Sequence, residues 1–283
     1  MEINDFLSLV RFKNTTIMVF YILIFSILMT RNFIIQDFLL ILIVNLLAVW
    51  SIYSFNDSED AEMEMSFKKG RKFFHKNIIL SGRVTKSGAL TTTMVLAISA
   101  LLLSMSIGNL NLVLTASILL LGFLYSNRNF RLKSKPPLDV LSHALIGPLI
   151  PLGIFINVGI GIIHVMILIS LFLGAIIPEL LNQRYDYNLD KKNKIRTTVQ
   201  LLGKSFSLKL IIMLAFAIII LNGIIFLLYG GMNLASIYIL LSPLLMMFLF
   251  KRVRQWIEKK PAILAIPVVV NLLVLLLGFF NLV

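Results

Sequence analysis

The stretch "LLILIVNLLAVWSIYSFNDSEDAEME", residues 39–64, decides the fold class of this chain. Its first part is apolar enough to lie inside a bilayer, where a helix needs about 20 such residues to cross ~30 Å of hydrocarbon. Its last nine residues, from Asn56 to Glu64, carry five carboxylates. Like charges spaced i, i+4 on a helix repel each other, and the repulsion grows as the surroundings become less polar. The stretch therefore predicts a membrane helix whose end binds something positive.

The rest of the chain has the same apolar character. Of its 283 residues, 59% are hydrophobic, and they form runs close to the length of a bilayer crossing. A soluble domain of this length is far less apolar. The sequence therefore predicts an all-α polytopic membrane protein with a single domain over residues 1–283. The nine predicted spans are 15–30, 36–56, 88–107, 111–127, 138–159, 162–182, 210–228, 235–250 and 262–281.

The net charge of +13 is distributed unevenly between the two sides of the membrane. With these spans, 25 of the 26 Lys and Arg residues lie on the side of the N-terminus, and only Arg31 lies on the other. Positive residues mark the cytoplasmic face of a membrane protein. The charge therefore predicts a cytoplasmic N-terminus and contact with membrane lipid, and it argues against a nucleic-acid partner.

Two of the predicted cytoplasmic loops, residues 57–87 and 183–209, have the same plan. Each begins with polar residues four apart, which lie on one face of a helix that continues past the membrane. Each then has a Gly followed by a basic residue, in "LSGRVTKS" and "LLGKSFS". We interpret this plan as an internal repeat of spans one to four and five to eight, with the ninth span appended. The first polar set is Asn56, Asp60 and Glu64, and the second is Glu179, Asn182, Asp186 and Asp190.

The two polar sets have the ligand chemistry of a magnesium site. They offer carboxylate and amide oxygens, and the chain has no cysteine to offer a thiolate. Hard oxygen donors favour Mg²⁺, which commonly binds a few carboxylates together with substrate phosphates. The surrounding Lys and Arg residues favour a polyanion, and a diphosphate fits both features. A solvated acidic loop that balances the basic "KKGRK" segment is the weaker interpretation, because two copies share one spacing on one face of the membrane.

These motifs resemble those of the UbiA superfamily of intramembrane prenyltransferases. The family pattern has NDxxDxxxD after the second span and DxxxD after the sixth, in a nine-helix bundle; this chain has "NDSEDAEME" and "DYNLD". The segments "LYSNRNFRLKSKPPLD" and "LSGRVTKSGAL" are similar to the family's segments after the fourth span and before the third. The chain also departs from the pattern. Asn77-Ile78 and Arg11-Phe12 stand where the family has Arg-Pro, and Lys194 and Thr197-Thr198 stand where it often has Gly and "TL".

The resemblance implies a Mg²⁺-dependent transfer of a prenyl group from an allylic isoprenyl diphosphate to a lipophilic acceptor, through ionisation to a carbocation. It implies two ions, one at each acidic motif. Asp60, Asp186 and Tyr125 would be the catalytic residues, with Tyr125 contacting the diphosphate or the cation. The implied metal ligands are Asn56, Asp60 and Glu64, with Asp57 nearby, for one ion, and Asp186 and Asp190 for the other.

The resemblance also implies a set of contacts to the substrates. Arg83, Arg131 and Lys133 are expected to hold the diphosphate, and Lys76 is a candidate substitute for the missing Arg of the Arg-Pro pair. Glu179, one helical turn inside Asn182, is expected either to act as a base toward the acceptor or to support the metal ligands.

Two other functions stay open at this point. The same ionisation without an external acceptor would make the protein a terpene cyclase of UbiA type. A cation-coupled transporter belongs to another class, but transporters place their sites near the bilayer midplane, whereas these acids lie at predicted helix ends. The sequence contains no motif that selects the acceptor, the prenyl chain length or an oligomeric state.

Overall fold

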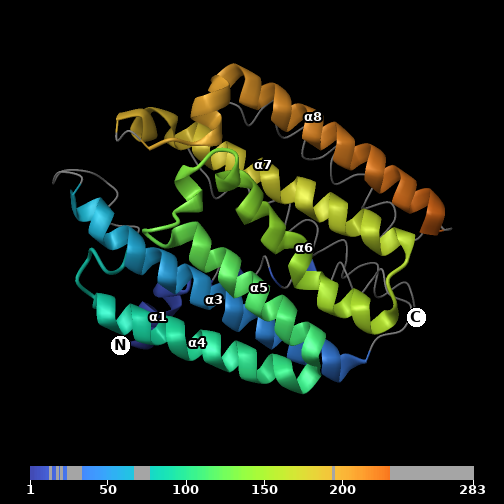
Figure 1. Ribbon diagram of the computed structural model, residues 1–283, viewed down its shortest axis with the longest axis horizontal. Coiled ribbons are helices and arrows are strands. Elements are labelled where there is room, and N and C mark those ends of the chain that lie inside the picture. The colour runs from blue at the N-terminus through green and yellow to red at the C-terminus, as the bar shows by residue number, and fades with distance from the viewer. Residues whose placement is uncertain are drawn as a thin grey trace.

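Long helices alternate in direction through the part of the chain that the computed structural model describes, residues 1–12, 15–16, 19, 22–23, 34–66, 77–192 and 195–229 (Figure 1). Six of them are long and apolar enough to cross a membrane, and the described residues contain no strand. The all-α prediction is therefore confirmed for this part. The helices are α1 (Ile3–Leu9), α3 (Ile35–Ser66), α4 (Lys86–Ile107), α5 (Asn109–Ser126), η2 (Leu132–Ser134, a 3₁₀ turn), α6 (Leu138–Val158), α7 (Ile162–Lys192) and α8 (Thr198–Tyr229).

Predicted spans 36–56, 88–107, 111–127, 138–159 and 162–182 correspond to α3 to α7. The first span lies mostly, and the eighth and ninth lie wholly, outside the described residues. The count of nine helices and the cytoplasmic N-terminus therefore stay predictions.

The helices pack as two groups that meet along α5 and α6. Helix α3 packs against α4 and α5, and α7 packs between α6 and α8 (Figure 1). The larger cluster of buried side chains, which includes Val49, Ile118 and Phe155, joins α3, α5 and α6. A second cluster joins α6, α7 and α8 through Val140, Leu180 and other buried residues. Since lipid tails are as apolar as these side chains, close packing and interhelical hydrogen bonds hold such helices together.

Helices α3 and α7 are longer than a bilayer crossing requires. They have 32 and 31 residues, which at about 1.5 Å per residue exceeds the ~30 Å of hydrocarbon by some 15 Å. The excess lies at their C-terminal ends, where the acidic motifs are. This confirms the prediction that each polar set continues a membrane helix. Both ends lie at the same end of the bundle, together with η2 and the start of α8 (Figure 1); we call this the inner end.

Two glycines make matching turns after the two long helices. Gly82 has φ 75° and Gly203 has φ 77°, a left-handed conformation that glycine adopts without steric cost. Gly203 interrupts α8 near its start, so the helix begins at Thr198 although the sequence predicted a span only over 210–228. In both places the glycine precedes a basic residue, as in the sequence pattern. This likeness supports the internal repeat, which stays a prediction.

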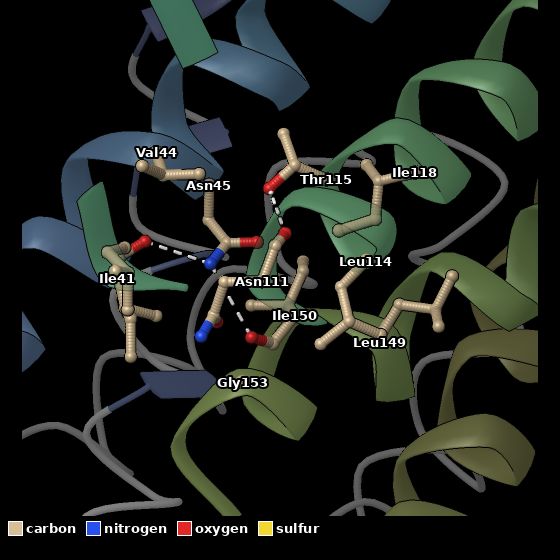
Figure 2. A pocket seen from close by; sticks show the side chains of 11 residues that line it. Ile41, Val44, Asn45, Asn111, Leu114, Thr115, Ile118, Leu149, Ile150 and Gly153 are labelled. Carbon is tan, nitrogen blue, oxygen red and sulfur yellow. Dashed lines mark hydrogen bonds between the residues drawn. The ribbon is translucent and has the colours of Figure 1, made fainter. Parts of the chain in front are cut away.

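A small pocket between α3, α5 and α6 is lined mainly by apolar side chains, together with Asn45, Asn111 and Thr115 (Figure 2). Asn45 of α3 donates to the Ile41 carbonyl at 2.8 Å and to the Ile150 carbonyl of α6 at 3.5 Å. Asn111 Oδ1 lies 2.4 Å from the position that a Cβ on Gly153 would occupy. Asn111 is near the start of α5, away from the inner end. These amides therefore join the three helices at a distance from the acidic motifs.

We predict that Gly122→Ala destabilises the bundle. A Cβ at this position of α5 would lie 2.3 Å from Cγ1 and 2.7 Å from Cγ2 of Ile52 in α3. A β-branched side chain in a helix cannot turn away freely, so the cost is about 1–3 kcal/mol. Thermal unfolding in detergent measures it. Gly174→Ala is the matched control, because a Cβ there meets nothing within 4 Å. If Gly122→Ala is equally harmful in an Ile52→Ala background, the close approach is not the cause.

Candidate active site

The connection between α5 and α6 brings a lysine against the acidic end of α3. Lys133 of η2 donates to Asn56 Oδ1 at 3.1 Å and forms an ion pair with Asp60. Its side chain is only 13% exposed. Ser126, the last residue of α5, donates to the same Asn56 oxygen at 2.8 Å. Three residues predicted for the site, Asn56, Asp60 and Lys133, therefore lie together.

Asp57 is held by the N-terminal segment. Arg11 donates to Asp57 Oδ1 at 2.6 Å, and its guanidinium carbon lies 5.0 Å from the centre of the Tyr53 ring. The Asp57 side chain is 2% exposed, and its Oδ2 has no hydrogen-bond partner among the described residues. Asn77, where the family has Arg, donates to the Asp57 carbonyl at 2.8 Å. Asp57 therefore anchors two other segments to α3, the N-terminal segment at Arg11 and the connection to α4 at Asn77.

Tyr125 and Glu179 meet across the bundle. The Tyr125 hydroxyl, near the end of α5, donates to Glu179 Oε1 of α7 at 3.4 Å. Gln183, one turn further along α7, donates to the same oxygen at 3.2 Å. The ring of His143 from α6 lies 6.1 Å from that of Tyr125, centre to centre. Two further residues predicted for the site are thus in contact with each other.

Gln183 and Asp139 are site residues that the sequence analysis missed. Asn182 was predicted to share one polar face of α7 with Glu179, but it is exposed and the buried amide is Gln183. Asp139, in the first turn of α6, is fully buried and accepts from Gln183 at 3.0 Å. The segment "KPPLD", residues 135–139, places an acid two residues after a Pro-Pro pair at the start of a membrane helix, and this is the signal that could have identified Asp139.

Asp186 and Asp190 continue along α7 from Glu179 and are half-buried. Burial, followed by the charges of Asp186 and Glu179, raises the pKa of the Asp190 carboxyl to about 7. A carboxylate that is hard to ionise beside other carboxylates gains most from a nearby cation. This end of α7 therefore has the electrostatics of a cation site.

Other predicted site residues lie apart from these contacts or outside the described part. Arg83 is 55% exposed, contacts Asp5 of α1 at 3.5 Å and donates to Ser81 at 3.3 Å. Arg131 has φ 43° and precedes η2, so its backbone turns the chain toward Lys133. Lys76 and the Glu64 side chain fall outside the described residues. The roles predicted for these four residues stay predictions.

The donors at the inner end fit magnesium. Asn56 and Asp60 offer hard oxygens that already hold a cation, the Lys133 ammonium. Asp57 has a buried oxygen for which the described part of the chain supplies no hydrogen-bond partner. Within the described residues, no three acidic or histidine side chains lie close enough together to hold an ion alone. Mg²⁺ usually binds one or two carboxylates and completes its shell with water and substrate phosphates. The site therefore suits an ion that arrives with a phosphate ligand.

Comparison with known proteins identifies the family. The model of the UbiA prenyltransferase family matches residues 16–266. A UbiA homologue from Archaeoglobus fulgidus bound to GPP and Mg²⁺ has a TM-score of 0.79 at 20% identity, over 97% of this chain and 98% of that chain. An apo UbiA homologue from Aeropyrum pernix K1 has a TM-score of 0.77 at 14% identity, over 95% and 98%. No curated protein matches the chain. The chain therefore belongs to the UbiA prenyltransferase family, as its motifs predicted, and is an integral multi-pass membrane protein.

We predict that Arg11→Leu lowers stability because it leaves Asp57 buried without its charge partner. Removing one partner of a buried ion pair costs about 3–5 kcal/mol; here the loss is about 2 kcal/mol, since the Arg11 side chain is 40% exposed. Thermal unfolding in detergent tests this. Arg83→Leu is the control, because Arg83 is 55% exposed and lies 3.5 Å from Asp5, so its ion pair is longer and more open to water than that of Arg11 with Asp57. Asp57→Asn in the Arg11→Leu background should recover most of the loss, and failure to recover would show that the charge is not responsible.

A second prediction concerns pH. Since the Asp190 pKa is about 7, most of this carboxyl is protonated at pH 6 and ionised at pH 8, and only the ionised form binds a metal ion. We expect apparent Mg²⁺ affinity, measured by diphosphate-analogue binding, to rise up to about tenfold over this range. The diphosphate itself titrates nearby, so Asp190→Asn is the control that isolates the residue. Equal pH dependence in both proteins would contradict the prediction.

Proposed function

We propose that this protein is a Mg²⁺-dependent intramembrane prenyltransferase that moves an isoprenyl group from an allylic isoprenyl diphosphate to a lipophilic acceptor. The observation that carries the proposal is the contact of Lys133 with Asn56 and Asp60 at the end of a membrane helix. A basic group and hard oxygen donors, side by side at the edge of an apolar bundle, suit a metal-bound phosphate attached to an apolar tail.

The relatives support the substrate class. UbiA homologues of the same fold bind GPP with Mg²⁺ and DMAPP with Mg²⁺, and both ligands are isoprenyl diphosphates. We infer that the diphosphate of such a substrate lies at the inner end, on the cytoplasmic side, with its isoprenoid tail between the helices. This arrangement keeps the charged head near water and the tail in apolar surroundings.

The proposed ligands of two Mg²⁺ ions are Asn56, Asp60 and Glu64 on α3, with Asp57 nearby, and Asp186 and Asp190 on α7. Bound ions would neutralise the charge that grows on the leaving diphosphate. Lys133 would then exchange its contact with Asp60 for the diphosphate oxygens and stabilise the same charge. Arg131, Arg83 and Lys76 are proposed as further diphosphate contacts.

The Tyr125–Glu179 pair is proposed to act on the reacting carbon skeleton. The aromatic face of Tyr125 would stabilise an allylic cation, and its hydroxyl is fixed by Glu179 at 3.4 Å. Glu179 is the proposed base that takes up the proton released by the prenyl acceptor. A dry pocket between the helices would protect the cation from water.

The test is incubation of the purified protein with geranyl, farnesyl and geranylgeranyl diphosphates, with Mg²⁺ or EDTA and without an acceptor. We expect slow, Mg²⁺-dependent release of diphosphate, reduced at least about 100-fold in Asp60→Asn and in Asp186→Asn, because each removes a metal ligand's charge. Glu59→Gln is the matched control, since Glu59 neighbours Asp60 but accepts from the Arg128 backbone at 3.0 Å.

The organic product decides between the two enzyme classes. A cyclised hydrocarbon from the diphosphate alone would replace the transferase proposal with a terpene cyclase. If the diphosphates neither react nor bind in a Mg²⁺-dependent way, the proposed function is wrong and the carboxylates serve another cation.

A further inference from the structure

We infer that Asp139 is a positioning residue that acts through Gln183 to orient Glu179 toward Tyr125. The catalytic part of this inference rests on the proposed function, and its structural part does not.

The first step of the argument is the environment of Asp139. Its carboxylate is fully buried and accepts hydrogen bonds from four neutral groups. Three of the donors are Val140 N at 2.9 Å, Gln183 Nε2 at 3.0 Å and Thr198 N at 2.6 Å. The fourth donor is the Thr198 hydroxyl. A buried carboxylate is stabilised when every oxygen accepts from fixed donors and a helix N-terminus lies beside it. Asp139 therefore joins α6, α7 and α8 at their inner ends.

The second step is that this carboxylate fixes the orientation of the Gln183 amide. Gln183 Nε2 donates to Asp139 Oδ2 at 3.0 Å and to Glu179 Oε1 at 3.2 Å, and Gln183 Oε1 accepts from Val199 N at 3.1 Å. A rotated amide would turn its oxygen toward both carboxylates and lose the Val199 bond. The two acceptors and one donor therefore select a single orientation.

The third step leads from Gln183 to the proposed chemistry. Glu179 Oε1 receives both the Gln183 amide and, at 3.4 Å, the Tyr125 hydroxyl. Gln183 thus holds the oxygen that Tyr125 contacts. Without Asp139 the amide loses one acceptor and gains freedom to rotate, and Glu179 loses the bond that orients it. The hydrogen bonds of Asp139 go to Val140, Gln183 and Thr198, and of these Gln183 is the residue that also contacts Glu179.

The variants follow from this geometry. Asp139→Asn keeps the shape but has only one acceptor oxygen. If its NH₂ group replaces Oδ2, the bonds from Gln183 and Thr198 N are lost, and if it replaces Oδ1, the bonds from Val140 N and the Thr198 hydroxyl are lost. Gln183→Leu removes the link directly. Thr198→Val is the matched control: it is nearly isosteric and removes one hydrogen bond from the same carboxylate, but leaves Gln183 untouched. Glu179→Ala defines the state in which Tyr125 has lost this partner.

The primary readout is the ¹⁹F spectrum of 3-fluorotyrosine incorporated at position 125, in detergent, without substrate. We expect Asp139→Asn and Gln183→Leu to move the signal toward that of Glu179→Ala, whereas Thr198→Val retains the wild-type signal even where its melting temperature falls. A wild-type signal in Gln183→Leu, or an equal change in Thr198→Val, would overturn the inference. If Asp139→Asn does not fold, Gln183→Leu alone tests whether Gln183 orients Glu179. Asp139→Glu then takes the place of Asp139→Asn as the test of whether the position of the carboxylate matters.

The second readout is the release of diphosphate from geranyl diphosphate with Mg²⁺. We expect kcat to fall about tenfold in Asp139→Asn and in Gln183→Leu with KM within about twofold, and the double variant to resemble the singles, because both break one path. If the double variant loses as much kcat as the two single variants combined, Asp139 acts independently of Gln183 as a helix-capping residue, and the inference is wrong. If the wild-type protein neither binds nor ionises the diphosphate, the proposed function fails, while the ¹⁹F result still decides the positioning role.

Discussion

Carboxylates at the end of an apolar helix must be compensated, and the inner end of this bundle is arranged around that constraint. Asp60 is compensated by Lys133, Asp57 by Arg11, and Asp139 by backbone, amide and hydroxyl donors. Each compensating group comes from a different part of the chain: the α5–α6 connection, the N-terminal segment, and α7 with the start of α8. The charges that serve the proposed chemistry therefore also fix the positions of the elements around it.

The length of α3 and α7 makes this arrangement possible. A helix that ended at the membrane surface would leave its motif on a flexible loop, whereas these two helices carry their acidic residues beyond the hydrocarbon on a rigid backbone. Their partners can then approach from the side. Gly82 lies in the connection that follows α3 and Gly203 near the start of α8, which follows α7, and both have a positive φ of similar size.

Much of the fold could be predicted from the sequence, because apolar runs of bilayer length and the placement of basic residues are local signals. The acidic motifs could be predicted for the same reason, since spacing of four residues defines a helix face. The sequence did not reveal that Gln183 rather than Asn182 faces inward. Which of two adjacent positions is buried depends on how α7 is rotated about its axis where it packs against α6 and α8, and the local sequence does not determine that rotation. It also did not reveal Asp139, whose donors, Gln183 and Thr198, lie 44 and 59 residues away. Such partners depend on packing that no local pattern encodes.

The contact of Lys133 with Asp60 and Asn56 also bears on how such a protein is made. An acidic helix end without a counterion would oppose its own insertion and packing next to lipid. Here the chain supplies that counterion from its own sequence, so the bundle can assemble in a membrane before any metal ion or substrate reaches it. Assembly of the bundle therefore does not require a metal ion to balance Asp60, whereas the carboxylates at the end of α7 retain the mutual repulsion that a cation would relieve.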